Sequence, residues 1–248
     1  MDRRVAVLAL LLCATGALVG CTTAPVADPK AQAARADAVI ASPVRTDQDR
    51  RMDAARHPAE FLAFTQVQPG MRALDVSAGA GYTSQLIALA VGPGGMLWAQ
   101  SPRPGPALAK RLEEHPQANF VAVVRPFDDP VPPEATGLDL VTIILNYHDI
   151  SYLPVDRAQM NQRLFAALKP GGRLVVIDHS AKGGTGISQG QTLHRIDEAV
   201  VRSELAQAGF VLDAEGAFLR NPADTREASS NNPATPTDKF VLRFVKPR

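Results

Sequence analysis

Several common kinds of functional site are missing from this sequence. Its 248 residues include two cysteines, Cys13 and Cys21, so everything beyond them has no thiol for a disulfide, a redox pair or a thiolate metal site. The five histidines show no H-x-x-x-H pairing, which argues against a metal site. No G-x-S-x-G elbow and no P-loop occur, which argues against an α/β-hydrolase and a P-loop nucleotide hydrolase.

An excess of charge is also missing. The chain has 26 basic and 25 acidic residues, a net charge of +1, and no Lys/Arg run longer than two. This balance argues against a nucleic-acid partner. The 46% hydrophobic content suits one globular domain with a full-sized core and some extra sequence at the ends.

The N-terminus has the pattern of an export signal. Arg3-Arg4 precedes an apolar run over 5–19, which is shorter than the roughly 20 residues of a membrane-spanning helix. Residues 18–21, Leu-Val-Gly-Cys, resemble a bacterial lipobox, so we expect a signal peptide over 1–20 and a lipid on Cys21. An ordinary cleaved signal peptide with an incidental cysteine is the alternative.

The same analogy predicts the location of the protein. Because Thr22 rather than Asp follows the cysteine, we expect anchoring in the outer membrane, facing the periplasm, with the lipid as the only membrane attachment. Translation from Met52 would instead give a cytoplasmic protein, but it would cut into the charged stretch before the first helix.

Composition divides the rest of the chain into two parts. Residues 21–41 are rich in Ala, Pro and small polar residues and are predicted to be a flexible tether, with a frayed helix around 30–40. The densely charged stretch 45–56 is predicted to be a solvated turn and helix start. We expect one folded domain over 42–248.

Hydrophobic patterning within this domain predicts alternating strands and helices. One helix is predicted to begin at Pro58 and another to end at residue 112, and three more are predicted over 83–90, 157–168 and 197–209. Strands are predicted over 73–76, 96–100, 119–124, 138–145, 173–177, 210–214 and 239–244. The last two strands have no helix between them. The fold class is therefore α/β, with a doubly wound, mostly parallel, Rossmann-like sheet of about seven strands and a C-terminal antiparallel hairpin.

A glycine-rich turn follows the first strand. Ser77, Gly79 and Gly81 occupy alternate positions before the helix over 83–90, an arrangement in which backbone N–H groups and a helix N-terminus face a ligand. Glycine lets the backbone approach a ligand closely. Asp75, near the strand end, can hold a cationic or hydroxylic part of that ligand. A tight turn without a ligand is the structural alternative.

The chain resembles the class I S-adenosylmethionine-dependent methyltransferases over about residues 50–247. The likeness rests on the glycine-rich turn, the strand 138–145 followed by Asn146-Tyr-His-Asp149, the turn and strand over 168–178, and the terminal hairpin. Within that superfamily it is most similar to a bacterial group of predicted, often exported methyltransferases. The resemblance implies S-adenosylmethionine as cofactor and a small-molecule acceptor.

The resemblance also assigns cofactor-binding residues, with two departures. Ser77 replaces the usual first glycine, and its hydroxyl could bond the amino acid end of the cofactor. Gln100 stands where an acidic residue usually holds both ribose hydroxyls, and an amide oxygen accepts more weakly than a carboxylate. Asp128 or Asp129 fits beside the adenine amine, although residues 127–130 also suit a surface turn. Asn146 is the last predicted cofactor ligand.

Residues after the fourth strand are the predicted catalytic group. His148 is a possible base because its unperturbed pKa lies near 6.5, Asp149 would orient it or bind substrate, and Tyr147 completes the group. His179 is a second possible base. The structural alternative is that Tyr147 and His148 pack against the helix over 53–64.

Three functions compete at this stage. The first is an exported methyltransferase acting on a small molecule. The second is a ligand-binding lipoprotein that kept the fold and lost the chemistry, which Ser77 and Gln100 favour. The third, a nicotinamide oxidoreductase, is disfavoured because the third glycine of its motif is absent.

Overall fold

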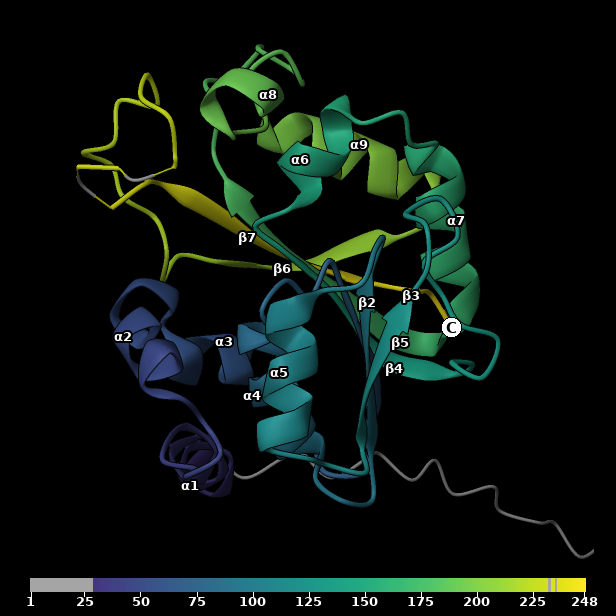
Figure 1. Cartoon of the computed structure of the whole chain (residues 1–248). Coiled ribbons are helices and arrows are strands. Elements are labelled where there is room, and N and C mark those ends of the chain that lie inside the picture. Colours follow the sequence, from purple (N-terminus) through teal and green to yellow (C-terminus); the bar gives the residue numbers. More distant parts are fainter. Residues whose placement is uncertain (1–28, 232, 235) are drawn as a thin grey trace, which may run out of the picture.

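A mixed β-sheet forms the centre of the protein (Figure 1). The computed structural model describes residues 29–231, 233–234 and 236–248, so the predicted signal peptide and Cys21 lie outside the described residues. In the described part the sheet has seven strands in the order β3-β2-β1-β4-β5-β7-β6. The strands are β1 (Arg72–Val76), β2 (Met96–Ser101), β3 (Phe120–Val124), β4 (Leu138–Ile144), β5 (Leu168–His179), β6 (Val211–Gly216) and β7 (Lys239–Val245).

The strand directions confirm the predicted fold class. β1 to β5 are parallel, whereas β7 runs antiparallel to both β5 and β6 and so closes the sheet with a hairpin. The helices are α1 (Pro29–Ile40), α2 (Asp47–Arg56), α3 (Pro58–Thr65), α4 (Tyr82–Val91), α5 (Pro106–Glu114), α6 (Tyr147–Tyr152), α7 (Arg157–Ala167), α8 (Gly190–Leu193) and α9 (Glu198–Gln207). Among the described residues, none of these helices is long and apolar enough to cross a membrane.

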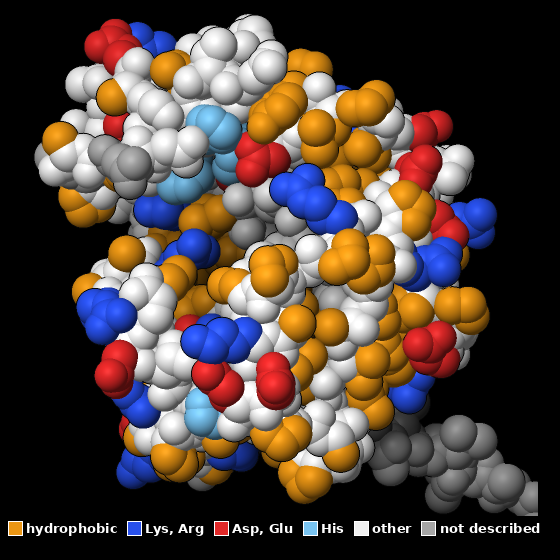
Figure 2. All heavy atoms as spheres, in the orientation of Figure 1, with side chains coloured by type: hydrophobic (Ala, Val, Ile, Leu, Met, Phe, Trp, Pro, Cys, Tyr) orange, Lys and Arg blue, Asp and Glu red, His pale blue; other side chains and the backbone are white. Residues whose placement is uncertain are grey.

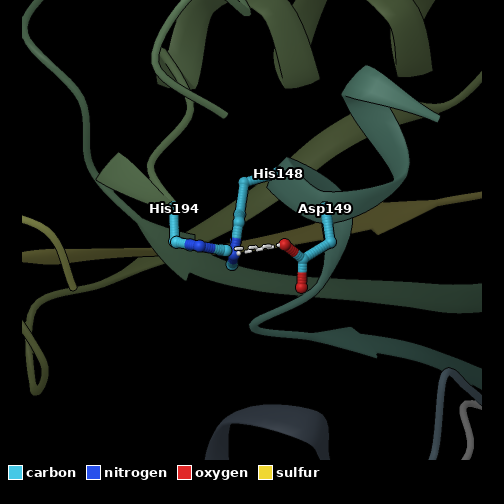
Figure 3. Close-up of side chains that lie close together, drawn as sticks. All are labelled: His148, Asp149 and His194. Atoms are coloured by element: carbon cyan, nitrogen blue, oxygen red, sulfur yellow. Dashed lines mark hydrogen bonds and ion pairs between the residues drawn. The ribbon is translucent and has the colours of Figure 1, made fainter. Parts of the chain in front are cut away.

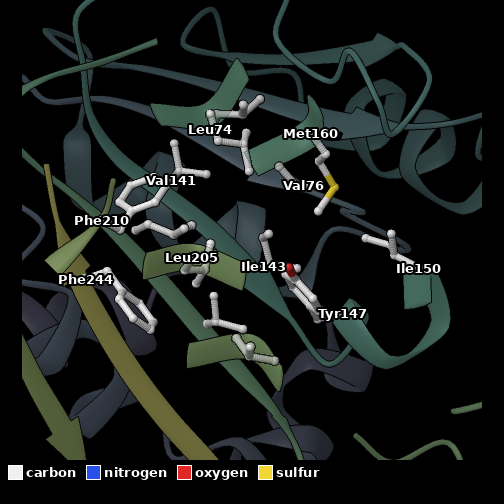
Figure 4. Close-up of a cluster of buried hydrophobic side chains, with 14 of the residues drawn as sticks. Leu74, Val76, Val141, Ile143, Tyr147, Ile150, Met160, Leu205, Phe210 and Phe244 are labelled. Atoms are coloured by element: carbon white, nitrogen blue, oxygen red, sulfur yellow. The ribbon is translucent and has the colours of Figure 1, made fainter. Parts of the chain in front are cut away.

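Helices cover both faces of the sheet. In β1, Leu74 and Val76 pack in the core beneath α6, α7 and α9, whereas the preceding residue, Ala73, packs beneath α1, α3 and α4. Figure 4 shows the first of these two layers, in which Met160 and Leu205 from the helices meet the strand side chains. A parallel sheet buried on both faces leaves its strand ends as the place where a ligand can enter.

The N-terminal boundary of the folded domain differs from the prediction. Residues 29–40 form α1, which packs on the domain with Ala36 and Val39 buried, so this half of the predicted tether belongs to the core. Arg35 also donates a hydrogen bond to Gln68 Oε1 at 3.0 Å. Most of the apolar residues of α1 are alanines, which made the segment resemble a tether in the sequence.

The charged stretch before α3 is also more than a solvated turn. It forms α2, whose N-terminus has a capping box between Thr46 and Asp49. Asp49 is buried and accepts two hydrogen bonds of 2.7 Å from Arg111 on α5. Buried Arg45 pairs with Asp53 in the same way. These ion pairs fix α2 beside the glycine-rich turn.

Strand β5 is longer than predicted. The sequence predicts a turn at Lys169-Pro-Gly-Gly172, but this segment lies within β5. The pairing of β5 with the start of β4 is irregular there. Gly172 permits this because a Cβ at that position would lie 2.8 Å from the carbonyl oxygen of Leu138. The short helices α6 and α8 were not predicted, since four to six residues carry too little periodicity.

We predict that α1 stabilises the domain. Val39→Asp should lower the free energy of unfolding by roughly 2–4 kcal/mol, because it places a carboxylate in a buried apolar contact. Ala34→Asp, on the exposed side of the same helix, is the matched control and should change stability by less than about 0.5 kcal/mol. Urea unfolding of the two variants checks this, and equal stabilities would mean that α1 does not belong to the core.

Candidate functional site

A cleft of about 780 Å³ opens at the carboxyl edge of the sheet, between the ends of β4, β5 and β7 and the C-terminal end of α2. Figure 2 shows this hollow, with histidine, Lys and Arg side chains gathered around it. The residues that line it include Arg56, Leu145, His148, Asp149, His179 and Lys239. Leu145 has φ of 54°, a strained conformation for a branched residue.

His148 is held from behind by a buried carboxylate. Asp178, at the end of β5, lies 2.6 Å from His148 Nδ1 and accepts the backbone N–H of His148 at 2.8 Å. Burial disfavours the charged imidazolium, but hydrogen bonds with Asp149 and Asp178 outweigh it and raise the pKa of His148 to about 9. The imidazole is therefore protonated at neutral pH, which differs from the near-neutral pKa expected of a base.

Asp149 joins two histidines. Its Oδ1 lies 3.2 Å from His148 Nε2 and 3.0 Å from His194 Nδ1, and Asn146 donates to its Oδ2 at 3.1 Å (Figure 3). Burial raises the pKa of this carboxyl, yet the bonds to His148 and His194 prevail and lower it to about 2. The sequence argument against a metal site considered only histidines close in sequence, whereas the fold brings these three side chains together.

Three further basic residues of the cleft, His179, Lys239 and Arg56, have no carboxylate partner in the described part of the chain, whereas Arg220 pairs with Glu198 and Asp238. Burial, with the nearby charge of Lys239, lowers the pKa of His179 to about 2, so this imidazole is neutral, and its Nδ1 lies 2.7 Å from Thr237 Oγ1. Burial lowers the pKa of Lys239 and of Arg56 as well. Neither cation has a carboxylate within ion-pair distance among the described residues.

The glycine-rich turn lies beside this cleft and has an open surface. Ser77, Gly79 and Gly81 all adopt positive φ, and a Cβ added at Gly79 would meet no atom within 4 Å. Gly79 and Ala80 are exposed, and their N–H groups have no acceptor in the described part of the chain. Arg111 donates to the Ala80 carbonyl at 2.8 Å, which links the turn to the buried pair with Asp49.

Asp75 does not face this opening. It is 2% exposed and accepts hydrogen bonds from Ser84 at 2.5 Å and Thr142 at 2.7 Å. Burial is the main cause that raises the pKa of Asp75 to about 6. The structure thus corrects its predicted contact with a ligand, since the carboxyl instead ties β1 to α4 and β4.

Gln100 is likewise occupied by the protein. Its side chain is fully buried, its Oε1 accepts the Ser77 N–H at 3.0 Å, and its Nε2 donates to the Arg125 carbonyl at 2.6 Å. The residue predicted to face a ribose therefore holds the turns after β1 and β3. The predicted ligands Asp128 and Asn146 are half-buried, and Asn146 Oδ1 is a buried acceptor without a partner among the described residues.

Comparison with solved structures identifies the fold. No protein-family model and no curated protein matches the sequence. Among solved structures, a SAM-dependent methyltransferase from Aquifex aeolicus matches with a TM-score of 0.59 at 16% identity, over 82% of this chain and 100% of that one. One from Mesorhizobium loti matches at 0.57 and 16%, over 78% and 99%. A SAM-dependent O-methyltransferase from Thermotoga maritima matches at 0.51 and 18%, over 76% and 64%.

The chain has the class I S-adenosylmethionine-dependent methyltransferase fold. The sequence resemblance is confirmed at this level. The narrower likeness to an exported bacterial group is untested by these structures, because their identities, all below 20%, establish the fold alone.

In this methyltransferase fold, Tyr147 is not available for catalysis. It is completely buried, its hydroxyl donates to Glu204 Oε2 at 2.7 Å, and Asn161 donates to the same hydroxyl at 2.8 Å. Its predicted catalytic role is therefore wrong. The alternative of packing against the helix over 53–64 is wrong too, since Tyr147 packs beneath α7 and α9.

Sequence reasoning missed several residues of the candidate site. Arg56 and Lys239 are separated by most of the chain, and no local pattern marks them as one site. Asp49 and Arg111, which hold the turn, are 62 residues apart. The contact between Asp178 and His148 could have been predicted from one feature of the sequence. The two residues lie at the carboxyl ends of neighbouring strands, and these ends meet at one edge of the sheet.

We predict that Gln100 is a structural residue of this methyltransferase fold. Gln100→Glu should lower the free energy of unfolding by roughly 1–3 kcal/mol or more, because a carboxylate cannot donate to the Arg125 carbonyl and is buried beside it. Gln207→Glu, at an exposed position of α9, is the control and should be nearly neutral. If Gln100→Glu kept full stability and bound S-adenosylmethionine more tightly, residue 100 would contact the ribose of the cofactor, as the sequence predicts.

Proposed function

We propose that this protein is an S-adenosylmethionine-dependent methyltransferase acting on a small-molecule acceptor. The observation that carries the proposal is the exposed turn at Gly79 and Ala80, whose free N–H groups lie at the edge where this fold binds ligands. Such N–H groups, with the N-terminus of α4, suit the carboxylate end of the cofactor. When bound, the cofactor supplies an electrophilic methyl group on its sulfonium.

The cleft beside the turn is the proposed acceptor site. Its volume of about 780 Å³ lies within the range of small-molecule pockets. Arg56 and Lys239 place two cations in it without a carboxylate partner among the described residues, so we expect an acceptor with an anionic group. An acceptor held between these cations and the histidines of the cleft would be confined for in-line transfer.

His148 orients the acceptor in this proposal. Asp178 holds its Nδ1, so Nε2 faces Asp149 at the cleft wall. With a pKa raised to about 9 by Asp149 and Asp178 against the opposing effect of burial, His148 donates a hydrogen bond at neutral pH more readily than it accepts a proton. Removal of a proton from the acceptor then requires one of two conditions. Either the acceptor group is itself acidic, or another cation takes the place of the proton on His148.

A second candidate is a non-catalytic protein that binds a ligand in the same cleft. The engagement of Gln100 by the backbone favours it, because the residue at the usual acidic ribose position is an amide already bonded to the Ser77 N–H and the Arg125 carbonyl. Such a protein would bind a ligand without transferring a methyl group. Incubation with radiolabelled S-adenosylmethionine and a panel of anionic and neutral small molecules separates the two functions.

We predict that a side chain at position 79 blocks the cofactor. Gly79→Val should weaken S-adenosylmethionine binding by at least about 100-fold, equivalent to roughly 2.7 kcal/mol, because the branched side chain occupies the open space above the turn. Isothermal titration of the purified chain with S-adenosylmethionine, its demethylated product and NAD gives the measurement.

Gly137→Val is the matched control for this prediction. Gly137 has a similar positive φ and equally open surroundings, but it lies before β4, at the opposite edge of the sheet. Both variants should lose comparable stability from backbone strain, and only Gly79→Val should lose the cofactor. No binding by the wild type would reject the proposed function, and equal binding by both variants would reject the site.

We also propose that the protein is exported and anchored through Cys21, which faces the periplasm from the outer membrane. The lipobox-like sequence supports this. A start at Met52 is disfavoured because it would delete Arg45 and Asp49 and leave Arg111 buried without its carboxylate.

Cys21→Ser should release the protein from the membrane fraction or leave an uncleaved precursor. The physical reason is that the thiol is the attachment point of the acyl chains. Fractionation and immunoblotting of both forms check this, with Cys13→Ser as control. Unchanged membrane association and processing of Cys21→Ser would contradict the anchor.

A further inference from the structure

Three side chains with metal-binding atoms converge at the cleft, and two of them, His148 and Asp149, line it. His148 and Asp149 belong to α6 and His194 follows α8, and Figure 3 shows the three pointing toward one another. Asp149 Oδ1 lies 3.2 Å from His148 Nε2 and 3.0 Å from His194 Nδ1, and all three ligand atoms lie within 4.8 Å of one another. Nitrogen ligands about 2.0–2.1 Å from a tetrahedral Zn²⁺ are about 3.3 Å apart, so little movement would admit an ion.

The surroundings orient each of these ligand atoms. Asp178, fully buried at the end of β5, is 2.6 Å from His148 Nδ1, which directs Nε2 toward Asp149. Asn146 donates to Asp149 Oδ2, whereas Oδ1 faces the two histidines and also accepts a hydrogen bond from the exposed Tyr152 hydroxyl at 3.1 Å. Metal-binding histidines commonly donate their second N–H to a carboxylate in this way, which fixes the ring and its tautomer.

Close packing of two short helices brings His194 into the cluster. A Cβ at Gly190, the first residue of α8, would lie 2.8 Å from Ser151 Oγ and 2.9 Å from the His148 carbonyl oxygen, so only glycine lets α8 approach α6 this closely. Ser230 from the connection between β6 and β7 donates to the His194 carbonyl at 2.8 Å. His194 itself has φ of 50°, a conformation maintained by these contacts.

We propose that His148, Asp149 and His194 bind one divalent transition-metal ion, with a further coordination position open to the cleft. Two imidazoles and one carboxylate suit Zn²⁺ and its first-row neighbours rather than Mg²⁺ or Ca²⁺, which prefer oxygen ligands. Three protein ligands leave room for an exogenous oxygen, as in catalytic metal sites. Arg56 and Lys239 line the same cleft as His148 and Asp149, so their positive charges would favour an anionic oxygen at the open position.

This site is independent of the cofactor. An ion here would replace the proton on His148 Nε2 and polarise an oxygen bound at its open position. Without an ion, the same residues form a chain of hydrogen bonds and ion pairs from Asp178 to His194. Direct measurement of metal binding distinguishes these two states of the cluster.

The test uses the full chain without an affinity tag, treated with a chelator and then titrated with Zn²⁺ and with Co²⁺. We expect about one equivalent of Zn²⁺ to bind, and Co²⁺ to give the visible absorption of a low-coordinate nitrogen and oxygen site. His194→Gln and Asp149→Asn should each weaken Zn²⁺ binding by at least about 100-fold. His115→Gln, which removes a histidine outside the cleft, should bind as the wild type does.

A second measurement covers variants that fold poorly. Zn²⁺ should raise the unfolding midpoint of the wild type and of His115→Gln but not that of Asp149→Asn, because a ligand stabilises only the state that binds it. No stoichiometric Zn²⁺ binding by the wild type, or unchanged binding in both ligand variants, would overturn the proposal. S-adenosylmethionine titrated into His194→Gln should still bind, which separates failure of the metal site from failure of the proposed function.

Discussion

The central sheet is buried on both faces, and this constraint decides where everything else lies. Its strands pack against α1, α3 and α4 on one face and α6, α7 and α9 on the other, so neither face can receive a ligand. The carboxyl edge is where the turns diverge, and it holds both the glycine-rich turn and the cleft. The proposed cofactor, acceptor and metal sites are neighbours because they share this one edge.

Buried charges organise that edge. Asp178 holds His148, the Asp49–Arg111 pair holds the glycine-rich turn, and buried Arg195 binds Asp224 in the long connection before β7. Each pair loses hydration on burial, and removal of one partner typically costs roughly 3–5 kcal/mol because the other charge stays buried. These pairs are therefore better regarded as positioning devices than as sources of net stability.

The cleft combines two kinds of group. His148 and Asp149 line it and meet His194, and these three are proposed to hold an ion, whereas Arg56 and Lys239 line the same cleft and attract negative charge. A small anionic acceptor would bridge the two groups with its nucleophile close to the turn that is proposed to bind the cofactor. The neutral state of His179, set by burial and the nearby cations, keeps a further positive charge out of this space.

The sequence by itself determined the strands, the glycine-rich turn and the closing hairpin, because periodicity, glycine spacing and loop length are local properties of the chain. It also indicated that polar residues would gather at the strand ends. Only the tertiary structure decided which of them face the cleft. Tyr147 and Gln100 point into the protein, where Glu204 and two backbone groups satisfy them.

Tertiary structure likewise decided the domain boundary and the histidine cluster. The small apolar residues of α1 became core only because α3 and α4 offer them a surface. Asp149 and His194 are 45 residues apart, and their meeting depends on the close approach of α8 to α6 at Gly190. Contacts of this kind arise from packing between distant segments, and no pattern of neighbouring residues encodes them.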